Sequence, residues 1–152
     1  MTTRLFSLLL VLCAGLPFTA LCETPTGYDW VVSHHGGPHI DTISDPTELT
    51  KRAATWAQSP AASLAFFTSE LGSSDPRHVK AGILSIAILA RAVDYTGPNQ
   101  VSAEAKAQFD KNFPVEQLKK LLSSHPEYAE WLMPLRSTER ARAFPQLQSP
   151  PP

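Results

Sequence analysis

The chain is poor in cysteine. Its 152 residues include two cysteines, Cys13 and Cys22, and both lie within the first 22 positions. If this segment is cleaved off, no thiol remains for a disulfide, for nucleophilic catalysis or for a thiolate metal site. This absence excludes the class of small secreted proteins that disulfides hold together, so an apolar core has to stabilise the fold.

An excess of charge of one sign is also missing. The 13 Lys and Arg residues nearly balance the 14 Asp and Glu residues, whereas binding to nucleic acid or to an anionic membrane requires a clustered basic surface. Beyond the N-terminal segment, no apolar run is long enough for a transmembrane helix. We therefore expect a soluble mature chain that binds no nucleic acid and has no transmembrane segment.

The N-terminal segment over residues 1–22 has the organisation of a signal peptide. Arg4 supplies a positive charge, an apolar stretch follows over residues 5–15, and Pro17 ends it before it reaches membrane-spanning length. The pattern predicts export, either to the periplasm or out of the cell.

Cleavage of this segment is predicted before Glu23, because Ala20 and Cys22 place small residues where signal peptidases require them. Cleavage after Ala20 is the alternative. A lipoprotein attached through Cys22 is a third interpretation. Leu21 argues against it, because bacterial lipoproteins carry a small residue directly before the lipidated cysteine.

Fourteen prolines would normally argue against helices, but several stand where helical patterns begin. Proline suits the first position of a helix because the N–H that it lacks would have no partner there, and its φ is already helical. Five prolines occupy such positions: Pro46, Pro60, Pro76, Pro114 and Pro126.

Polar residues before the predicted helices can accept hydrogen bonds from the first free backbone N–H groups. Asp45, Ser59 and Asp75 directly precede three of the prolines, and Ser102 precedes a further helical pattern. Asp45 and Glu48 also resemble a capping box, in which the glutamate side chain reaches back to the cap residue.

The spacing of apolar residues predicts up to six helices. They cover residues 46–58, 60–71, 76–95, 102–112, a stretch beginning at 114, and 126–134. Residues 81–90 are apolar almost all round, which predicts that the third helix is central. The predicted fold class is therefore all-α, a single small bundle of about five to six helices arranged as helical hairpins.

This helical domain is predicted to occupy residues 45–135. Residues 23–44 are predicted to form a short loop or extended segment, because β-branched and aromatic residues are followed there by a glycine-proline turn. One turn of helix over residues 28–32 is the alternative. The tail over residues 136–152 has little apolar surface to bury and is predicted to be loose. Its cluster of arginines, Arg136, Arg140 and Arg142, is interpreted as a solvated helix end.

The aromatic residues of the helices are candidates for the core and for a binding surface. Those expected in the core are Trp56, Phe66, Phe67, Phe109, Phe113 and Trp131. Phe66 and Phe67 are adjacent, so they diverge by about 100° on a helix and cannot both face one narrow seam. Phe66 and Trp30 are therefore the candidate anchors for a protein partner or for a homodimer.

Three of the five histidines lie in the segment VVSHHGGPHID, over residues 31–41. Neutral imidazole is a common metal ligand, so His34, His35 and His39 are candidates for a zinc site. Neither spacing matches a strong metal motif, and no His-Glu-x-x-His is present. The alternatives are a plain turn and a loop that contacts a partner, and we expect no cofactor.

Catalytic motifs are absent from the sequence. No Gly-x-Ser-x-Gly elbow presents a nucleophilic serine, and no Lys-Ser/Thr pair follows Gly36 and Gly37 to hold a phosphate. We therefore identify no catalytic residue and do not expect an enzyme.

These features favour an exported, non-catalytic helical binding protein with a protein partner. The predicted contact residues are Trp30, His34, His35, His39 and Phe66. The profile is similar to that of small periplasmic immunity proteins, which inhibit a secreted cell-wall-degrading toxin. The similarity lies in the overall profile and in no motif. Two alternatives stay open: a metal-binding protein or metal-dependent enzyme that uses the three histidines, and a carrier of a small apolar ligand.

Overall fold

The computed structural model describes residues 23–37, 45–143 and 145–147, so the predicted signal peptide lies outside the described part of the chain. The described residues form helices and no strands, which confirms the all-α class. The helices are α1 (Tyr28–His35), α2 (Pro46–Trp56), α3 (Pro60–Glu70), α4 (Pro76–Val93), α5 (Ala103–Lys111), α6 (Val115–Ser124), the 3-10 helix η1 (Pro126–Leu135), α7 (Glu139–Ala143) and the 3-10 helix η2 (Pro145–Leu147). They are more numerous than the five to six predicted. None of these described helices has both the length and the apolar character needed to cross a bilayer.

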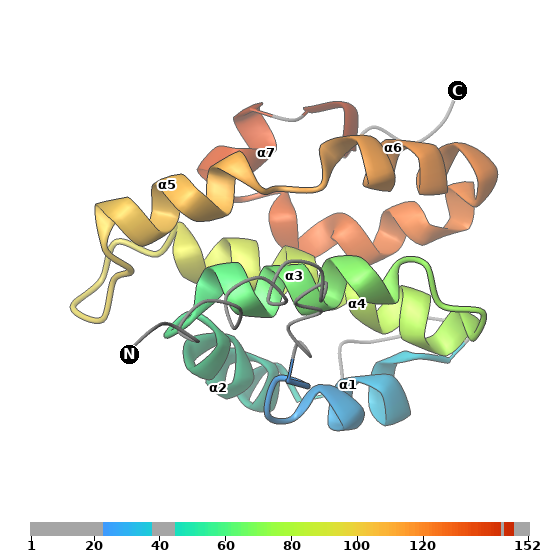
Figure 1. Ribbon diagram of the computed structural model, residues 1–152, viewed down its shortest axis with the longest axis horizontal. Helices are drawn as coiled ribbons and strands as arrows, with labels where there is room; N and C mark the ends of the chain where they lie inside the picture. Colours follow the sequence, from blue (N-terminus) through green and yellow to red (C-terminus); the bar gives the residue numbers. More distant parts are fainter. Residues whose placement is uncertain (1–22, 38–44, 144, 148–152) are drawn as a thin grey trace, which may run out of the picture.

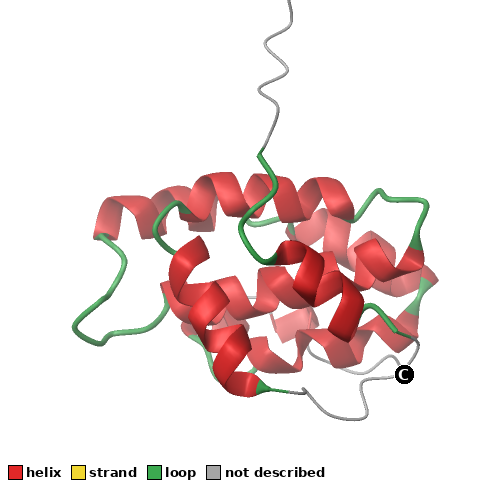
Figure 2. Ribbon diagram, turned by 90° about the horizontal axis from the view of Figure 1, so that it is seen from below, coloured by secondary structure: helices red, strands yellow, loops and turns green. Residues whose placement is uncertain are grey.

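Helix α4 is the centre of the fold, as the sequence predicts. It packs against α1, α2, α3 and η1, and every residue from Ala81 to Ala90 is buried. Figure 1 shows α1 and α2 on one side of α4 and α6, α7 and η1 on the other. The view from below in Figure 2 places α1 and α2 together in front of the remaining helices.

Burial confirms five of the six aromatic side chains predicted to fill the core: Trp56, Phe67, Phe109, Phe113 and Trp131. Phe66 is only partly buried and packs against this core. Gly82 of α4 allows α3 to come close, because a Cβ at this position would lie 3.1 Å from the carbonyl oxygen of Phe67.

Three of the four predicted caps form. Asp45 Oδ1 accepts from the backbone N–H of Glu48 at 3.1 Å, and Asp75 Oδ1 accepts from the backbone N–H of Arg77 at 2.9 Å. Ser102 Oγ likewise accepts from a backbone N–H at the start of α5. Ser59 makes no side-chain cap bond, so that prediction was wrong.

Of the two hydrogen bonds in the predicted capping box at the start of α2, only the one accepted by Asp45 forms. The carboxylate of Glu48 binds Lys51 and Arg52, both at 2.7 Å, in place of the backbone of Asp45. Two cations one turn further along the helix are stronger partners for a carboxylate than a neutral N–H group. Pro114 also differs from its prediction, because α6 begins at Val115 and the proline is its N-cap.

The prediction of a loop or extended segment was wrong for residues 28–35, which form α1. Tyr28, Val31 and His35 are buried on one face of α1 and follow helical spacing. Helix α1 packs on α4, so tertiary packing outweighs the weak local preference of these residues for helix. The helix begins after Gly27, whose φ of +83° favours glycine. Residues 38–44 of the same predicted segment lie outside the described residues.

The prediction of a loose tail was wrong for residues 136–143 and for Leu147. Arg140 is 3% exposed and Leu147 is fully buried. The Arg140 guanidinium binds Asp94 at the end of α4 and Asp110 of α5. These partners lie at least 30 positions away in sequence, so the local composition of the tail gave no sign of them. Residues 148–152 lie outside the described part of the chain.

Candidate functional site

Trp30 and His34 lie together on one flank of α1, facing α2. Their rings stack with centroids 4.4 Å apart, and the guanidinium carbon of Arg52 lies 4.0 Å from the centroid of the indole. We call Trp30, His34 and Arg52 the α1 corner. Trp30 is half-buried there, because its ring is engaged by side chains of the protein itself.

The predicted histidine cluster is divided by the structure. His34 is exposed, and its Nδ1 lies 2.9 Å from the carbonyl oxygen of Trp30. His35 is 4% exposed on the core side of α1, and His39 lies outside the described residues. Within the described ranges, no three His, Cys, Asp or Glu side chains come together as a metal site. A zinc site that includes His39 therefore stays a prediction.

Phe66 is half-buried against the core and is separated from Trp30. Its ring contacts Tyr28 edge to face at 5.0 Å. Tyr28 and Trp30 are two positions apart on α1, so they point to opposite sides of the helix. Phe66 and the α1 corner therefore do not form one patch, although each remains a predicted contact.

A polar cluster joins α1, α3 and α4 beneath the surface. His78 Nδ1 lies 2.6 Å from Glu70 Oε2, and the hydroxyl of Tyr28 donates to the same oxygen at 3.1 Å and to the carbonyl of His78 at 3.0 Å. Burial raises the pKa of the Tyr28 hydroxyl well above its ordinary value, and the neighbouring Glu70 carboxylate adds to this. The phenol therefore stays a proton donor, which suits a cross-link between helices.

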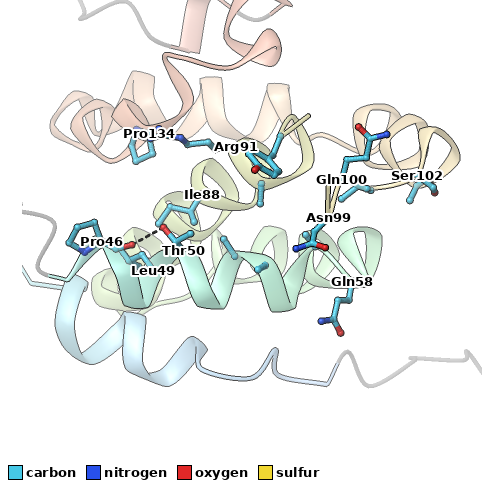
Figure 3. A pocket seen from close by; sticks show the side chains of 17 residues that line it. Pro46, Leu49, Thr50, Gln58, Ile88, Arg91, Asn99, Gln100, Ser102 and Pro134 are labelled. Atoms are coloured by element: carbon cyan, nitrogen blue, oxygen red, sulfur yellow. Dashed lines mark hydrogen bonds between the residues drawn. The ribbon is translucent and has the colours of Figure 1, made fainter. Parts of the chain in front are cut away.

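A groove lies between α2 and α4, with a volume of about 1130 Å³. Figure 3 shows Pro46 and Pro134 at one end and Gln58, Asn99 and Gln100 at the other. The remaining lining residues come from α2, α4, the loop before α5 and the start of α5: Leu49, Thr50, Ala53, Ala54, Ala57, Ile88, Arg91, Ala92, Tyr95, Val101, Ser102 and Ala105.

The lining of this groove is apolar along the floor and sparse in charge. Small and aliphatic side chains dominate it, and Arg91 is the one charged residue among the described residues that line it. The side chain of Arg91 is exposed and makes no hydrogen bond or ion pair within the described part of the chain. The groove thus combines an apolar surface with a single guanidinium that has no partner there.

The described surface exposes two large apolar side chains, and one of them lines the groove. Tyr95 is 57% exposed and Met133 is 53% exposed, and these are the large hydrophobic residues that the described surface exposes. Tyr95 lines the groove directly, and Met133 precedes Pro134 at its far end. The Tyr95 ring lies over Gly97, where a Cβ would come within 2.0 Å of its atoms, so a larger residue there would displace this exposed ring.

Sequence reasoning missed this site, and little in the sequence indicates it. Arg91 is the first charge after the apolar stretch ending at Ala90, and this signal would have marked where α4 reaches the surface. The groove itself arises where α2, α4 and the start of α5 meet. No local pattern encodes such a meeting of separate segments.

The chain matches no known protein-family model, and comparisons with curated proteins and with solved structures also gave no match.

Proposed function

We propose that this chain is an exported, non-catalytic binding protein whose partner occupies the groove between α2 and α4. The observation that carries the proposal is the character of the groove: the described residues that line it are mostly small or aliphatic, include no Asp, Glu or Lys, and include Arg91 and the exposed Tyr95. Protein interfaces are enriched in tyrosine, methionine and arginine and depleted of lysine and of acidic residues.

An inhibitor is the most concrete form of this function. The signal-peptide pattern at the N-terminus supports a role outside the cytoplasm, and a rigid scaffold such as α4 with a preformed contact surface suits tight inhibition. An immunity-type inhibitor of a secreted cell-wall-degrading toxin would bind the toxin through this groove and suppress its activity.

The test uses two tryptophan substitutions on α2. Ala54 lines the groove, whereas its neighbour Thr55 is exposed and does not line it. We expect the wild-type protein and the Thr55→Trp variant to co-purify with the same exported partner, and the Ala54→Trp variant to lose it. The purified partner should then lose its cell-wall-degrading activity when the wild-type protein is added.

A variant of the α1 corner tests whether the partner binds there and not in the groove. If the Ala54→Trp variant retains the partner while a Trp30→Ala, His34→Ala variant loses it, the groove is not the contact surface and the originally predicted residues are. If the partner is bound without effect on its activity, binding stands and inhibition fails.

A carrier of a small apolar ligand is the second candidate, because the same floor would accept an alkyl chain. Native mass spectrometry of the freshly purified protein would then show a bound small molecule, which the Ala54→Trp variant would lack. Proteins that enclose such ligands bury most of the ligand surface, whereas this hollow is a partly open groove.

A further inference from the structure

We infer that the groove accepts an amphipathic helix of the partner and that this helix places a carboxylate against Arg91. The inference rests on the proposed function and adds the chemistry of the occupant. Three features of the groove support it: the charge of its lining, the distribution of its polar groups, and its length.

The charge of the groove favours an anionic occupant. Arg91 has no partner among the described residues, and no Asp or Glu is found among the described residues that line the groove. Its neighbour one turn along α4, Asp94, is engaged by Lys106 at 2.8 Å and by Arg140 at 3.2 Å. A guanidinium bordered by apolar surface binds a carboxylate best, because the planar fork forms paired hydrogen bonds.

The distribution of polar groups favours a helix over an extended peptide. The side-chain amides of the lining, from Gln58, Asn99 and Gln100, gather at one end (Figure 3). Thr50 Oγ1 donates to the carbonyl of Pro46, and Ser102 Oγ accepts from a backbone N–H. An extended peptide would leave most of its backbone groups without partners along the apolar floor. A helix satisfies its own backbone groups and needs only apolar side chains there.

The dimensions also fit a helix. The α2 side of the groove runs from Pro46 to Gln58, which is about 18 Å at the helical rise of about 1.5 Å per residue, or roughly three turns. Ala53, Ala57 and Ala92 line the floor with small side chains, and small side chains at a helix contact allow two helices to come close.

The experiment is a selection from a phage-displayed library of random peptides of about 14 residues, panned against the full purified protein, with the Ala54→Trp variant for counter-selection. We expect enriched peptides to carry apolar residues at i, i+3 or i+4 and i+7 and an Asp or Glu on the flank of that stripe. Synthetic copies should bind the wild-type protein and become helical on binding.

Charge reversal then tests the contact with Arg91. We expect Arg91→Glu to weaken binding of such a peptide by about tenfold or more, since a charge-assisted hydrogen bond is lost and a repulsion is introduced. Replacing the peptide's acid with lysine should restore binding to this variant. Lys120→Glu is the matched control, because Lys120 is exposed on α6 and does not line the groove.

Failure of this inference is distinguishable from failure of the proposed function. The inference is overturned if the enriched peptides bind in an extended conformation. It is also overturned if they lack an acid and bind the Arg91→Glu variant as tightly as the wild-type protein, even when binding of the partner still depends on Ala54. The same holds if a fluorescent long-chain fatty acid binds the groove and no peptide is enriched. If neither a peptide nor the co-purified partner responds to Ala54→Trp, the proposed function fails as well.

Discussion

Two charged regions lie at the C-terminal end of α4, and they differ in whether their charges are paired within the protein. At the C-terminal junction, formed by Arg140, Asp94, Asp110 and Lys106, the opposite charges bind one another and Arg140 is buried. In the groove, Arg91 is exposed and has no partner among the described residues. Because Asp94 lies three residues after Arg91, the two are neighbours on the helix surface. The contrast shows that the fold uses the nearby acid to attach its tail, whereas Arg91 stays exposed and makes no ion pair within the described part of the chain.

The largest expected effect is at the junction. Replacing Arg140 with methionine leaves the buried carboxylate of Asp94 with Lys106 and the backbone N–H of residue 140, and it removes the guanidinium that lies 4.4 Å from the centroid of Phe109. Breaking a buried ion pair from one side costs about 3–5 kcal/mol, and we expect a loss near the lower end of this range. Urea denaturation followed by circular dichroism measures it.

The control for this variant is Arg142→Met, since Arg142 is exposed on the same short helix. It should leave the free energy of unfolding unchanged. A loss below about 1 kcal/mol for Arg140→Met would contradict the view that the junction holds the tail.

An intermediate effect is expected at the α1 corner. Arg52 binds Glu48 at 2.7 Å and lies over the indole of Trp30, so its charge is also used within the protein. Arg52→Ala should lower the free energy of unfolding by about 1 kcal/mol, which combines a cation–π contact with a helical ion pair. Lys51→Ala, which removes an exposed partner of the same glutamate, should cost less. Equal losses would mean that the indole contact adds nothing.

A smaller effect is expected from an exposed pair, and it depends on pH. Hydrogen bonds from the side chain and backbone of Arg77 lower the pKa of Asp75 from 3.8 to about 2. Because the folded-state pKa lies below the unfolded-state pKa, this carboxylate stabilises the fold above about pH 4, and the contribution is lost as the pH falls towards about 2.

The measurement is the difference in unfolding free energy between the wild-type protein and Asp75→Asn, from about pH 5 to about pH 2. We expect the difference to shrink as the pH falls. A difference that is constant over this range would exclude the titration of Asp75 as its source.

The smallest effect on stability is expected in the groove itself. Arg91→Ala and Tyr95→Ala remove exposed side chains that the fold does not use, so each should change the free energy of unfolding by no more than about 0.5 kcal/mol. Thermal and urea denaturation of both variants would check this. A loss comparable to that of Arg52→Ala would show that Arg91 serves the fold, and the contrast between the two regions would disappear.

The helical part of the fold was predictable because its signals are local. Asp45, Asp75 and Ser102 cap their helices with their own side chains, and Pro46, Pro60 and Pro76 occupy first helical positions. The apolar stretch of α4 predicted burial on every side, which the structure confirms. Such features depend on residues within a few positions of one another.

What the sequence did not reveal depends on distant contacts. Helix α1 has no side-chain cap and is held by packing on α4. The burial of Arg140 depends on acids at positions 94 and 110. The groove depends on three separate segments meeting around Arg91, whereas the predicted contact residues Trp30 and Phe66 were chosen for their chemistry alone and lie on different sides of α1.

The enclosure of α4 also determines which parts of the molecule open first. The amide hydrogens of Ala81–Ala90 reach solvent only when several surrounding helices separate, so we expect them to exchange with deuterium at the rate of global unfolding. Helices α5 and α6 each bury a single side chain, Phe109 and Leu118 respectively, and should exchange through smaller, local openings. The groove lies between these two regimes. Because the start of α5 belongs to the less protected part, we expect the groove to widen on its α5 side without unfolding of the core.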